Sequence, residues 1–163
     1  MTGGSPMAAS HDSKRQDKAA TNRKALHDYF VIDRLEAGVE LRGTEVKSVR
    51  SNNVTLTGGF ATIDAGGMVL HGVHIAPYEC GNRFNHDAVR PRRLLMHKRE
   101  LGRLAGQLAQ KGHTLIPLRM YFRGRWAKVE IGICKGKQDV DKRETLRRRD
   151  ADKEARNAIA RAR

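Results

Sequence analysis

The chain has 163 residues, with 32 Lys and Arg against 18 Asp and Glu, which gives a formal net charge of +14. This length allows one domain with a modest core plus sequence outside it, and the charge indicates a polyanionic partner such as a nucleic acid. No stretch approaches the roughly 20 apolar residues that span a bilayer, and the first residues lack the apolar core of a secretory signal. We therefore expect a cytoplasmic protein with no membrane partner, in which Cys80 and Cys134 are reduced packing residues.

Residues 1–21 are small, polar and charged, and they show no apolar periodicity. Such a segment buries too little apolar surface to offset the entropy that ordering costs. We expect a flexible N-terminal arm over residues 1–21.

Residues 22–136 contain short β-rich runs separated by turn residues, which predicts a barrel or sandwich. Glycines at 66–67 and 124 are placed where a hairpin needs positive φ. Near the end of this region, Val129, Ile131 and Ile133 alternate with more polar positions, which predicts one buried and one wetter face. The expected strands span residues 27–35, 38–41, 60–64, 68–75, 93–96, 114–122 and 125–134.

Two helices are expected among these strands. The first begins after Thr44, a suitable N-cap, and runs to about Ser51. The second spans residues 98–111, where leucines at 101, 104 and 108 recur at helical spacing, and Gly112 ends it. We interpret the leucine stripe as core packing.

Residues 137–163 form a basic tail without a core of its own. Between positions 135 and 163 there are eleven Lys and Arg, six Asp and Glu, and no aromatic residue. Good helix formers occur throughout and proline is absent, so we expect a segment that is disordered when free and helical on a polyanionic surface.

The sequence indicates no catalytic, metal or cofactor site. His71 and His74, the closest pair of candidate metal ligands, would point to opposite faces of a strand. His86 and Asp87 beside arginines could be imagined as an acid–base group for RNA cleavage, but a turn in which Asn85 and Asp87 bond their own backbone is the preferred interpretation. The Gly-Gly pairs at 58–59 and 66–67 lack the Lys-Ser/Thr of a nucleotide-binding loop.

A series of short segments, all in one order along the chain, carries a family pattern. They are NRKA at 22–25, HDY at 27–29, EAGV at 36–39, GTEVKS at 43–48, HIAPY at 74–78, NHD at 85–87, RLLMHKRE at 93–100, TLIPL at 114–118, KVEIG at 128–132, GK at 136–137 and DKR at 141–143. The chain thereby resembles the SsrA-binding protein (small protein B) family over nearly its whole length after residue 22.

The resemblance implies a mainly β fold, an antiparallel barrel related to the oligonucleotide-binding (OB) fold with two or three helices, over residues 22–136. It further implies a protein, monomeric when free, that binds the tRNA-like domain of transfer-messenger RNA and delivers it to stalled ribosomes. By motif position, four residues match those that the family uses for this RNA, and three nearby cations join them as candidates. The complete set is Asn22, Arg23, Lys24, Glu36, Lys47, Leu95 and Lys128.

Two of these residues leave alternatives open. Glu36 could accept a hydrogen bond from a base or ribose, or form a structural salt bridge with an arginine. Leu95 could contact RNA or belong to the core. Lys128 is most simply a phosphate contact.

The resemblance also gives the tail a role, in which it enters the vacant decoding centre and mRNA channel of the small ribosomal subunit. The matching residues are Gly136, Lys137, Asp141, Lys142, Arg143 and Ile159. Two other functions remain to be weighed: a structural ribosomal protein, which would share the basic composition, and an RNA-processing enzyme that uses His86 or another histidine as its base.

Overall fold

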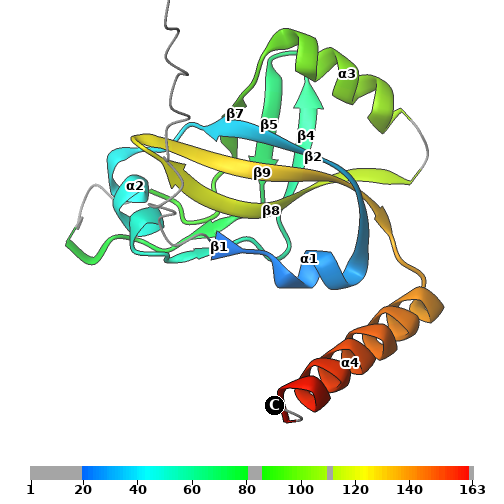
Figure 1. Cartoon of the computed structure of the whole chain (residues 1–163). Helices are drawn as coiled ribbons and strands as arrows, with labels where there is room; N and C mark the ends of the chain where they lie inside the picture. The colour runs from blue at the N-terminus through cyan, green and yellow to red at the C-terminus, as the bar shows by residue number, and fades with distance from the viewer. Residues whose placement is uncertain (1–19, 81–85, 110–111, 162–163) are drawn as a thin grey trace, which may run out of the picture.

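The computed structural model describes residues 20–80, 86–109 and 112–161 as a barrel with helices around it and a long helix at the C-terminus (Figure 1). Every strand pairing is antiparallel, and β9 pairs with both β2 and β8, which closes the main sheet into a ring. In sheet order the strands are β1 (Ala20–Thr21), β8 (His113–Arg123), β4 (Phe60–Asp64), β5 (Gly67–His71), β7 (Arg92–Leu95), β2 (Tyr29–Val39) and β9 (Trp126–Gly136). A second small sheet joins β3 (Val54–Thr55) to β6 (His74–Ile75). The expected mainly β barrel is confirmed.

The interior of the barrel is filled by aliphatic side chains from nearly every strand. Val129, Ile131 and Ile133 on β9 are all at most 1% exposed, as their alternation predicted. The hairpins β4–β5 and β8–β9 turn at Gly67 (φ 125°) and Gly124 (φ 64°), so the turn prediction is confirmed as well.

Three of the expected strands are divided differently in the structure. Runs 27–35 and 38–41 were predicted to be separate, but β2 is continuous through Gly38, which pairs with both Leu95 and Lys128. Conversely, run 68–75 divides into β5 and β6 at Gly72, where φ is +68° and an added Cβ would lie 2.9 Å from the carbonyl oxygen of Gly58.

Helix α1 (Arg23–Asp28) was not predicted, and the strand expected from His27 begins only at Tyr29. The helix starts at Asn22, whose side chain accepts a hydrogen bond from the backbone N–H of Ala25. It covers a small second cluster of buried residues, namely Ala25, Ile116, Leu118 and Cys134. A six-residue helix has too little periodicity to stand out in a sequence.

The two expected helices are present with shifted ends. Helix α2 (Gly43–Arg50) has Arg42 rather than Thr44 at its N-cap, and the carboxylate of Glu45 accepts from the N–H of Arg42. Helix α3 (Lys98–Leu108) ends earlier than predicted, and the rest of the expected helix reaches residues 110–111, which lie outside the described ranges. Leu104 is buried and both neighbouring leucines pack on the core, which confirms the packing interpretation.

Helix α4 (Asp139–Arg161) extends away from the barrel (Figure 1), so the tail is helical in this structure, and its disorder in the free chain stays a prediction. The expected arm included Ala20 and Thr21, but these residues form β1 and pair with β8; residues 1–19 lie outside the described part. Cys134 is buried as expected, whereas Cys80 is exposed, so that part of the packing prediction is wrong. Of the helices described, none is long and apolar enough to cross a membrane.

Candidate nucleic-acid interface

Three of the candidate RNA-binding residues meet on one surface, which we call the outer face: the solvent side of β2, β9 and β8 with the end of β7. Strand register brings them there, because Gly38 on β2 pairs with Leu95 on one side and with Lys128 on the other. Glu36 precedes Gly38 by two residues and therefore lies on the same side of β2. Residues that are distant in sequence, Glu36, Leu95 and Lys128, thus become neighbours.

Glu36 is the centre of a polar network on the outer face. The Tyr121 hydroxyl donates a hydrogen bond to its Oε2, while Lys128 Nζ lies 3.5 Å and Arg123 Nη1 3.7 Å from its Oε1. The hydrogen bond from Tyr121 has the largest effect on the pKa of Glu36 and lowers it; burial opposes this effect, and the charges of Lys128 and Arg123 add to it, so the pKa lies below its usual value. The carboxylate is therefore ionised at neutral pH.

Both alternatives for Glu36 have a structural counterpart. Its salt bridges are real, but they are long, and the residue remains exposed. An ionised carboxylate offers about four acceptor positions, so Glu36 retains capacity for a hydroxyl or amino group of a ligand. Burial and the hydrogen bond to Glu36 raise the pKa of Tyr121 to about 12, so this phenol remains a donor at neutral pH.

Leu95 is a surface residue, not a core residue. Its side chain is 56% exposed and lies over Gly38, where an added Cβ would come within 3.3 Å of the Leu95 Cβ. The glycine lets this apolar side chain sit flat on the sheet beside the polar network.

Asn22 differs from these three because it is buried, at 3% exposure. Its Nδ2 donates to the carbonyl oxygens of Leu56 (3.2 Å) and Pro117 (3.0 Å), and its Oδ1 caps α1. With both ends of the amide engaged, Asn22 fixes α1 to β8 and to the segment before β4.

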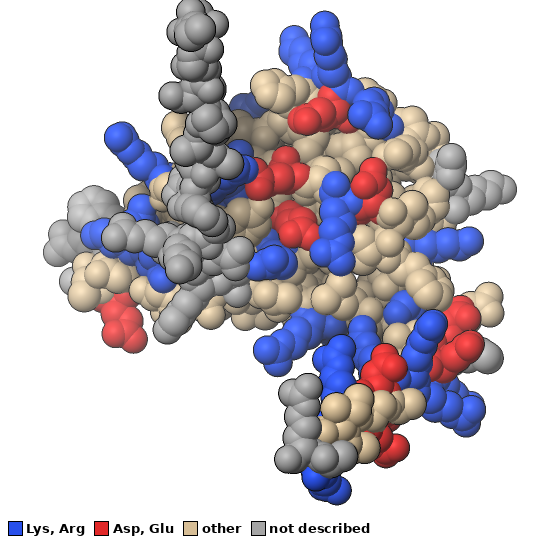
Figure 2. Space-filling model, viewed as in Figure 1, with Lys and Arg blue, Asp and Glu red and all other residues tan. Residues whose placement is uncertain are grey.

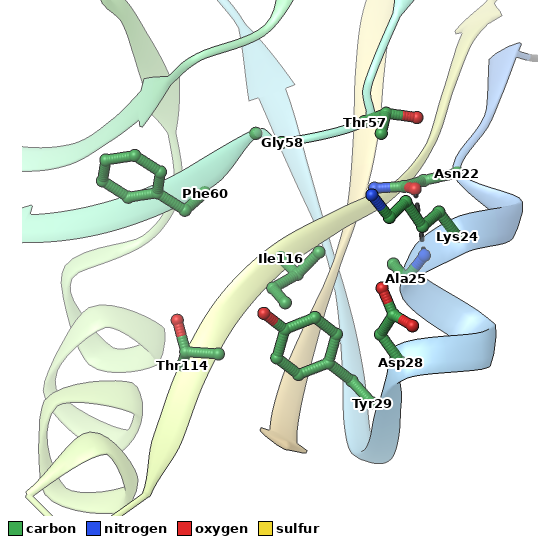
Figure 3. Close-up of a pocket in the computed structure, with 11 residues that line it drawn as sticks. Asn22, Lys24, Ala25, Asp28, Tyr29, Thr57, Gly58, Phe60, Thr114 and Ile116 are labelled. Carbon is green, nitrogen blue, oxygen red and sulfur yellow. Dashed lines mark hydrogen bonds between the residues drawn. The ribbon is translucent and has the colours of Figure 1, made fainter. Parts of the chain in front are cut away.

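The remaining candidate cations lie on helices away from the outer face. Arg23 and Lys24 are exposed on α1, and Lys24 lies at a cavity of about 300 Å³ between α1, β8 and the segment before β4 (Figure 3). Tyr29 and Phe60 contribute aromatic rings to the same cavity. Lys47 is on α2, with its Nζ 5.0 Å from the centre of the Tyr78 ring. The structure therefore divides the predicted set among three places.

Tyr121, Arg123 and Trp126 belong to the outer face but were not predicted. Strand register pairs Tyr121 with Lys128 and Arg123 with Trp126. The signal was available, because residues two positions from Lys128 share its side of β9, and the Gly124 turn carries the same side over to β8. Figure 2 shows basic and acidic side chains intermingled over these strands rather than a uniformly basic surface.

The base of α4 is fixed to the end of α1. Gly136 pairs with Tyr29, and the backbone N–H of Lys137 donates to the carbonyl oxygen of Asp28 (2.9 Å). The Lys137 ammonium lies 4.9 Å from the centre of the Phe30 ring. Gly136 and Lys137, which were predicted as tail residues, thus connect α4 to the end of α1.

Further along, the tail residues lie on a helix that is mostly exposed. Asp141 accepts a hydrogen bond from the backbone N–H of Gln138, as an acidic residue in a first helical turn commonly does. Lys142 faces α1, where its charge helps to lower the pKa of Asp28 after the larger effect of a hydrogen bond from His27. Arg143 is exposed, and Ile159 is 63% exposed near the far end.

A buried ionic cluster supports the other end of the barrel. Glu45 receives charged hydrogen bonds from Arg90 (2.5 Å) and Arg92 (2.9 Å), and Arg92 also donates to the carbonyl oxygens of Val73 and Ala88. Burial favours a higher pKa for Glu45, but the hydrogen bonds from Arg90 and the backbone of Arg42 and the charge of Arg92 outweigh it, so its pKa is lowered. The cluster ties α2 to β7 and to the turn before it.

Two of the histidines considered as metal ligands or catalytic bases contact other side chains of the fold. His71 Nε2 lies 3.0 Å from Thr62 Oγ1, and its ring stacks on Phe60. The turn at Asp87 is confirmed, because Asp87 Oδ1 accepts from the N–H of Val89 (3.0 Å), whereas Asn85 lies outside the described residues. Within the described ranges, no group of three or more His, Cys, Asp or Glu residues could hold a metal ion.

Comparison with known proteins gives concordant matches. A family model described as SmpB protein matches residues 19–161. An SsrA-binding protein of Carboxydothermus hydrogenoformans is 54% identical over 140 residues, which cover 86% of this chain and 94% of the relative. An SsrA-binding protein of Roseiflexus sp. is 50% identical over 154 residues, covering 94% and 96%. A solved structure described as "tmRNA-SmpB: a journey to the center of the bacterial ribosome" matches with a TM-score of 0.65 and 47% identity, over 80% of this chain and 95% of that one.

Proposed function

This chain belongs to the SmpB protein family, and we propose on that premise that it binds the tRNA-like domain of transfer-messenger RNA and delivers it to the A site of stalled ribosomes. It acts there by binding and positioning, without catalysis, metal or cofactor. A protein with this task works in the cytoplasm, and we propose that it is a monomer when free.

The observation that carries the proposal is the meeting of Glu36, Leu95 and Lys128 on the outer face. A lysine supplies charge for phosphate, a carboxylate can accept from a ribose hydroxyl or a base amino group, and an apolar side chain can lie against an exposed base. Folded RNA is recognised through such mixed contacts rather than through charge alone. The intermingled charges of this surface fit a partner of defined shape (Figure 2).

We assign the residues two kinds of role. Glu36, Leu95 and Lys128 contact RNA directly, whereas Asn22 acts indirectly, because its buried amide positions α1. The exposed cations Arg23, Lys24 and Lys47 add charge at the sides of the barrel, and their contribution is electrostatic.

The tail is the part that meets the small ribosomal subunit, entering the vacant decoding centre and the mRNA channel. Its 23-residue helix would be about 35 Å long, and it leaves the barrel at Gly136 and Lys137. Asp141, Lys142 and Arg143 lie near its start and Ile159 near its end. A basic helix that projects from the domain supports this use, since a channel lined with RNA phosphates attracts such charge.

A gel-shift titration tests the RNA-binding half of the proposal. The full chain is titrated against transfer-messenger RNA and against an ordinary tRNA at one fixed salt concentration, together with Lys128→Ala and a control, Lys153→Ala, which changes an exposed lysine on α4. We expect tight binding that prefers transfer-messenger RNA and that Lys128→Ala weakens. Equal, weak binding of both RNAs would instead favour a structural ribosomal protein, and cleavage of the RNA would favour an enzyme.

A second experiment tests the division of labour. The double variant Lys142→Ala/Arg143→Ala should bind transfer-messenger RNA nearly as well as the native chain but should abolish peptide tagging on stalled ribosomes. If it loses RNA binding in proportion to tagging, the tail and the barrel do not have separate partners.

A further inference from the structure

Trp126 is a large aromatic residue that the fold does not use. It is the only tryptophan in the chain and is 71% exposed at the first position of β9. Among the described residues, no aromatic or cationic side chain stacks on its ring. Burying an aromatic ring is strongly favourable, and tryptophan is enriched on surfaces where proteins bind partners, so this exposed ring is a candidate contact residue.

The position of Trp126 connects it to the outer face. Trp126 and Lys128 share one side of β9, and Trp126 pairs in register with Arg123, whose guanidinium lies 3.7 Å from Glu36. The tip of the β8–β9 hairpin carries a second cation, Arg125, which is also exposed. The ring therefore extends the row of RNA-contacting residues to the end of the hairpin.

We propose that Trp126 is a stacking platform for one unpaired base of the RNA held on the outer face, with Arg123 and Arg125 taking the adjoining phosphates. This inference rests on the proposed function and adds a contact to it. An aromatic ring flanked by cations is the arrangement with which proteins hold single-stranded bases, because every base has a π face and a nearby phosphate.

The same geometry argues against a partner without phosphate. An apolar protein partner would have to desolvate the two flanking guanidinium groups, which is costly unless it supplies matched carboxylates. Lys128 lies on the same face, so three cations stand near the ring, of which Lys128 and Arg123 also contact the carboxylate of Glu36. An RNA loop supplies a base to stack on the ring and phosphates to pair with the cations.

The single tryptophan provides the measurement. The fluorescence of the native chain is followed during titration with the tRNA-like fragment of transfer-messenger RNA, with acrylamide as a probe of access to the ring. Stacking predicts quenching that saturates with binding, together with protection from acrylamide. In the gel-shift titration, which does not require the tryptophan, Trp126→Ala should weaken binding about tenfold, and Trp126→Phe should recover most of that loss.

Salt dependence separates the ring from the cations. Trp126→Ala should leave the slope of log affinity against log salt unchanged, whereas Arg125→Ala should reduce it by about one. Val89→Ala, an exposed apolar residue outside the outer face, serves as the control and should bind as the native chain does. Circular dichroism checks that each variant is folded, which the exposure of these side chains leads us to expect.

Three results would overturn the inference. The first is unchanged fluorescence at saturating RNA, the second is native affinity in Trp126→Ala, and the third is a fluorescence change that follows protein concentration without RNA, which would indicate self-association. Each presupposes that the native chain prefers transfer-messenger RNA to tRNA. Absence of that preference would refute the proposed function itself.

Discussion

Replacing Asn22 should destabilise the fold more than a single polar substitution usually does. In Asn22→Ala the cap of α1 is lost, at about 1 kcal/mol, and two carbonyl oxygens lose the N–H groups of the amide, at about 1 kcal/mol each. We therefore expect the free energy of unfolding to fall by about 3 kcal/mol. This corresponds to roughly 6–12 °C in Tm for a chain of this size.

Asn22→Asp separates the capping oxygen of the side chain from its donating nitrogen. Aspartate keeps the oxygen that caps α1 but replaces the donating Nδ2 with a second acceptor, which would face the carbonyl oxygens of Leu56 and Pro117. Although aspartate is a good N-cap residue, Asn22→Asp should lower the free energy of unfolding at least as much as Asn22→Ala, because one carboxylate oxygen would face carbonyl oxygens in a buried site. Asn53→Ala, on the surface, should change stability by less than about 0.5 kcal/mol.

Urea unfolding monitored by circular dichroism measures these differences, and RNA affinity is measured in parallel. If Asn22 acts by positioning α1, binding by Asn22→Ala should recover in a stabilising osmolyte, which favours the folded state. Native stability in Asn22→Asp, combined with lost RNA binding that osmolyte does not restore, would contradict the positioning role and make Asn22 a direct contact.

Three further substitutions test other parts of the structure. Gly59→Ala should cost about 1–3 kcal/mol, because the added Cβ would lie within 2.8 Å of a core side chain; Gly66→Ala, where the same atom meets open space, should be close to neutral in the same urea assay. Tyr121→Phe should return the lowered pKa of Glu36 toward its ordinary value, as followed by an NMR titration of the carboxyl group. Because the pKa of Glu36 is lower in the folded state, its ionisation stabilises the fold above the unfolded pKa, and this stability is lost as the pH falls through the folded pKa. In Tyr121→Phe the loss should be smaller, so the free energy of unfolding should depend less on pH in the acid range. Arg92→Met should destabilise by about 3 kcal/mol or more, because it removes one of two cations from a buried carboxylate and leaves carbonyl oxygens without their donor; a loss below 1 kcal/mol in urea unfolding would contradict that account.

The sequence was most informative where one physical signal dominated. The hairpins β4–β5 and β8–β9 were predicted from glycines between β-rich runs, and in the structure Gly67 and Gly124 have positive φ. The leucines of α3 gave an unambiguous helical period. These signals depend only on residues close in sequence, so they can be recognised without knowing which strands or helices pack against them.

Long-range contacts explain what the sequence did not reveal. Helix α1 depends on a cap whose amide binds carbonyl groups 34 and 95 residues away. The continuity of β2 through Gly38 depends on strands β7 and β9 on both sides. Likewise, Glu36 could be proposed from the family resemblance, but its partners Tyr121 and Arg123 required the strand register.

Sequence resemblance placed Asn22 and Lys128 in the same category, and the structure separates them. One is a buried amide whose nitrogen and oxygen are both hydrogen-bonded, and the other is an ammonium group at a half-buried position on the outer face. Motif matching finds residues that matter to a function without distinguishing contact from support. Burial supplies that distinction.

Helix α1 is held at both ends by different parts of the molecule. Its first residue follows the amide that is anchored to the barrel, and its last carbonyl accepts the N–H of Lys137, from which the tail continues. We therefore expect a ligand that orders the tail to alter the opening equilibrium of α1, and by thermodynamic reciprocity the state of α1 would then alter the affinity of the tail for that ligand. The rate of amide hydrogen exchange in residues 25–28 should consequently report whether the tail is bound to its ligand.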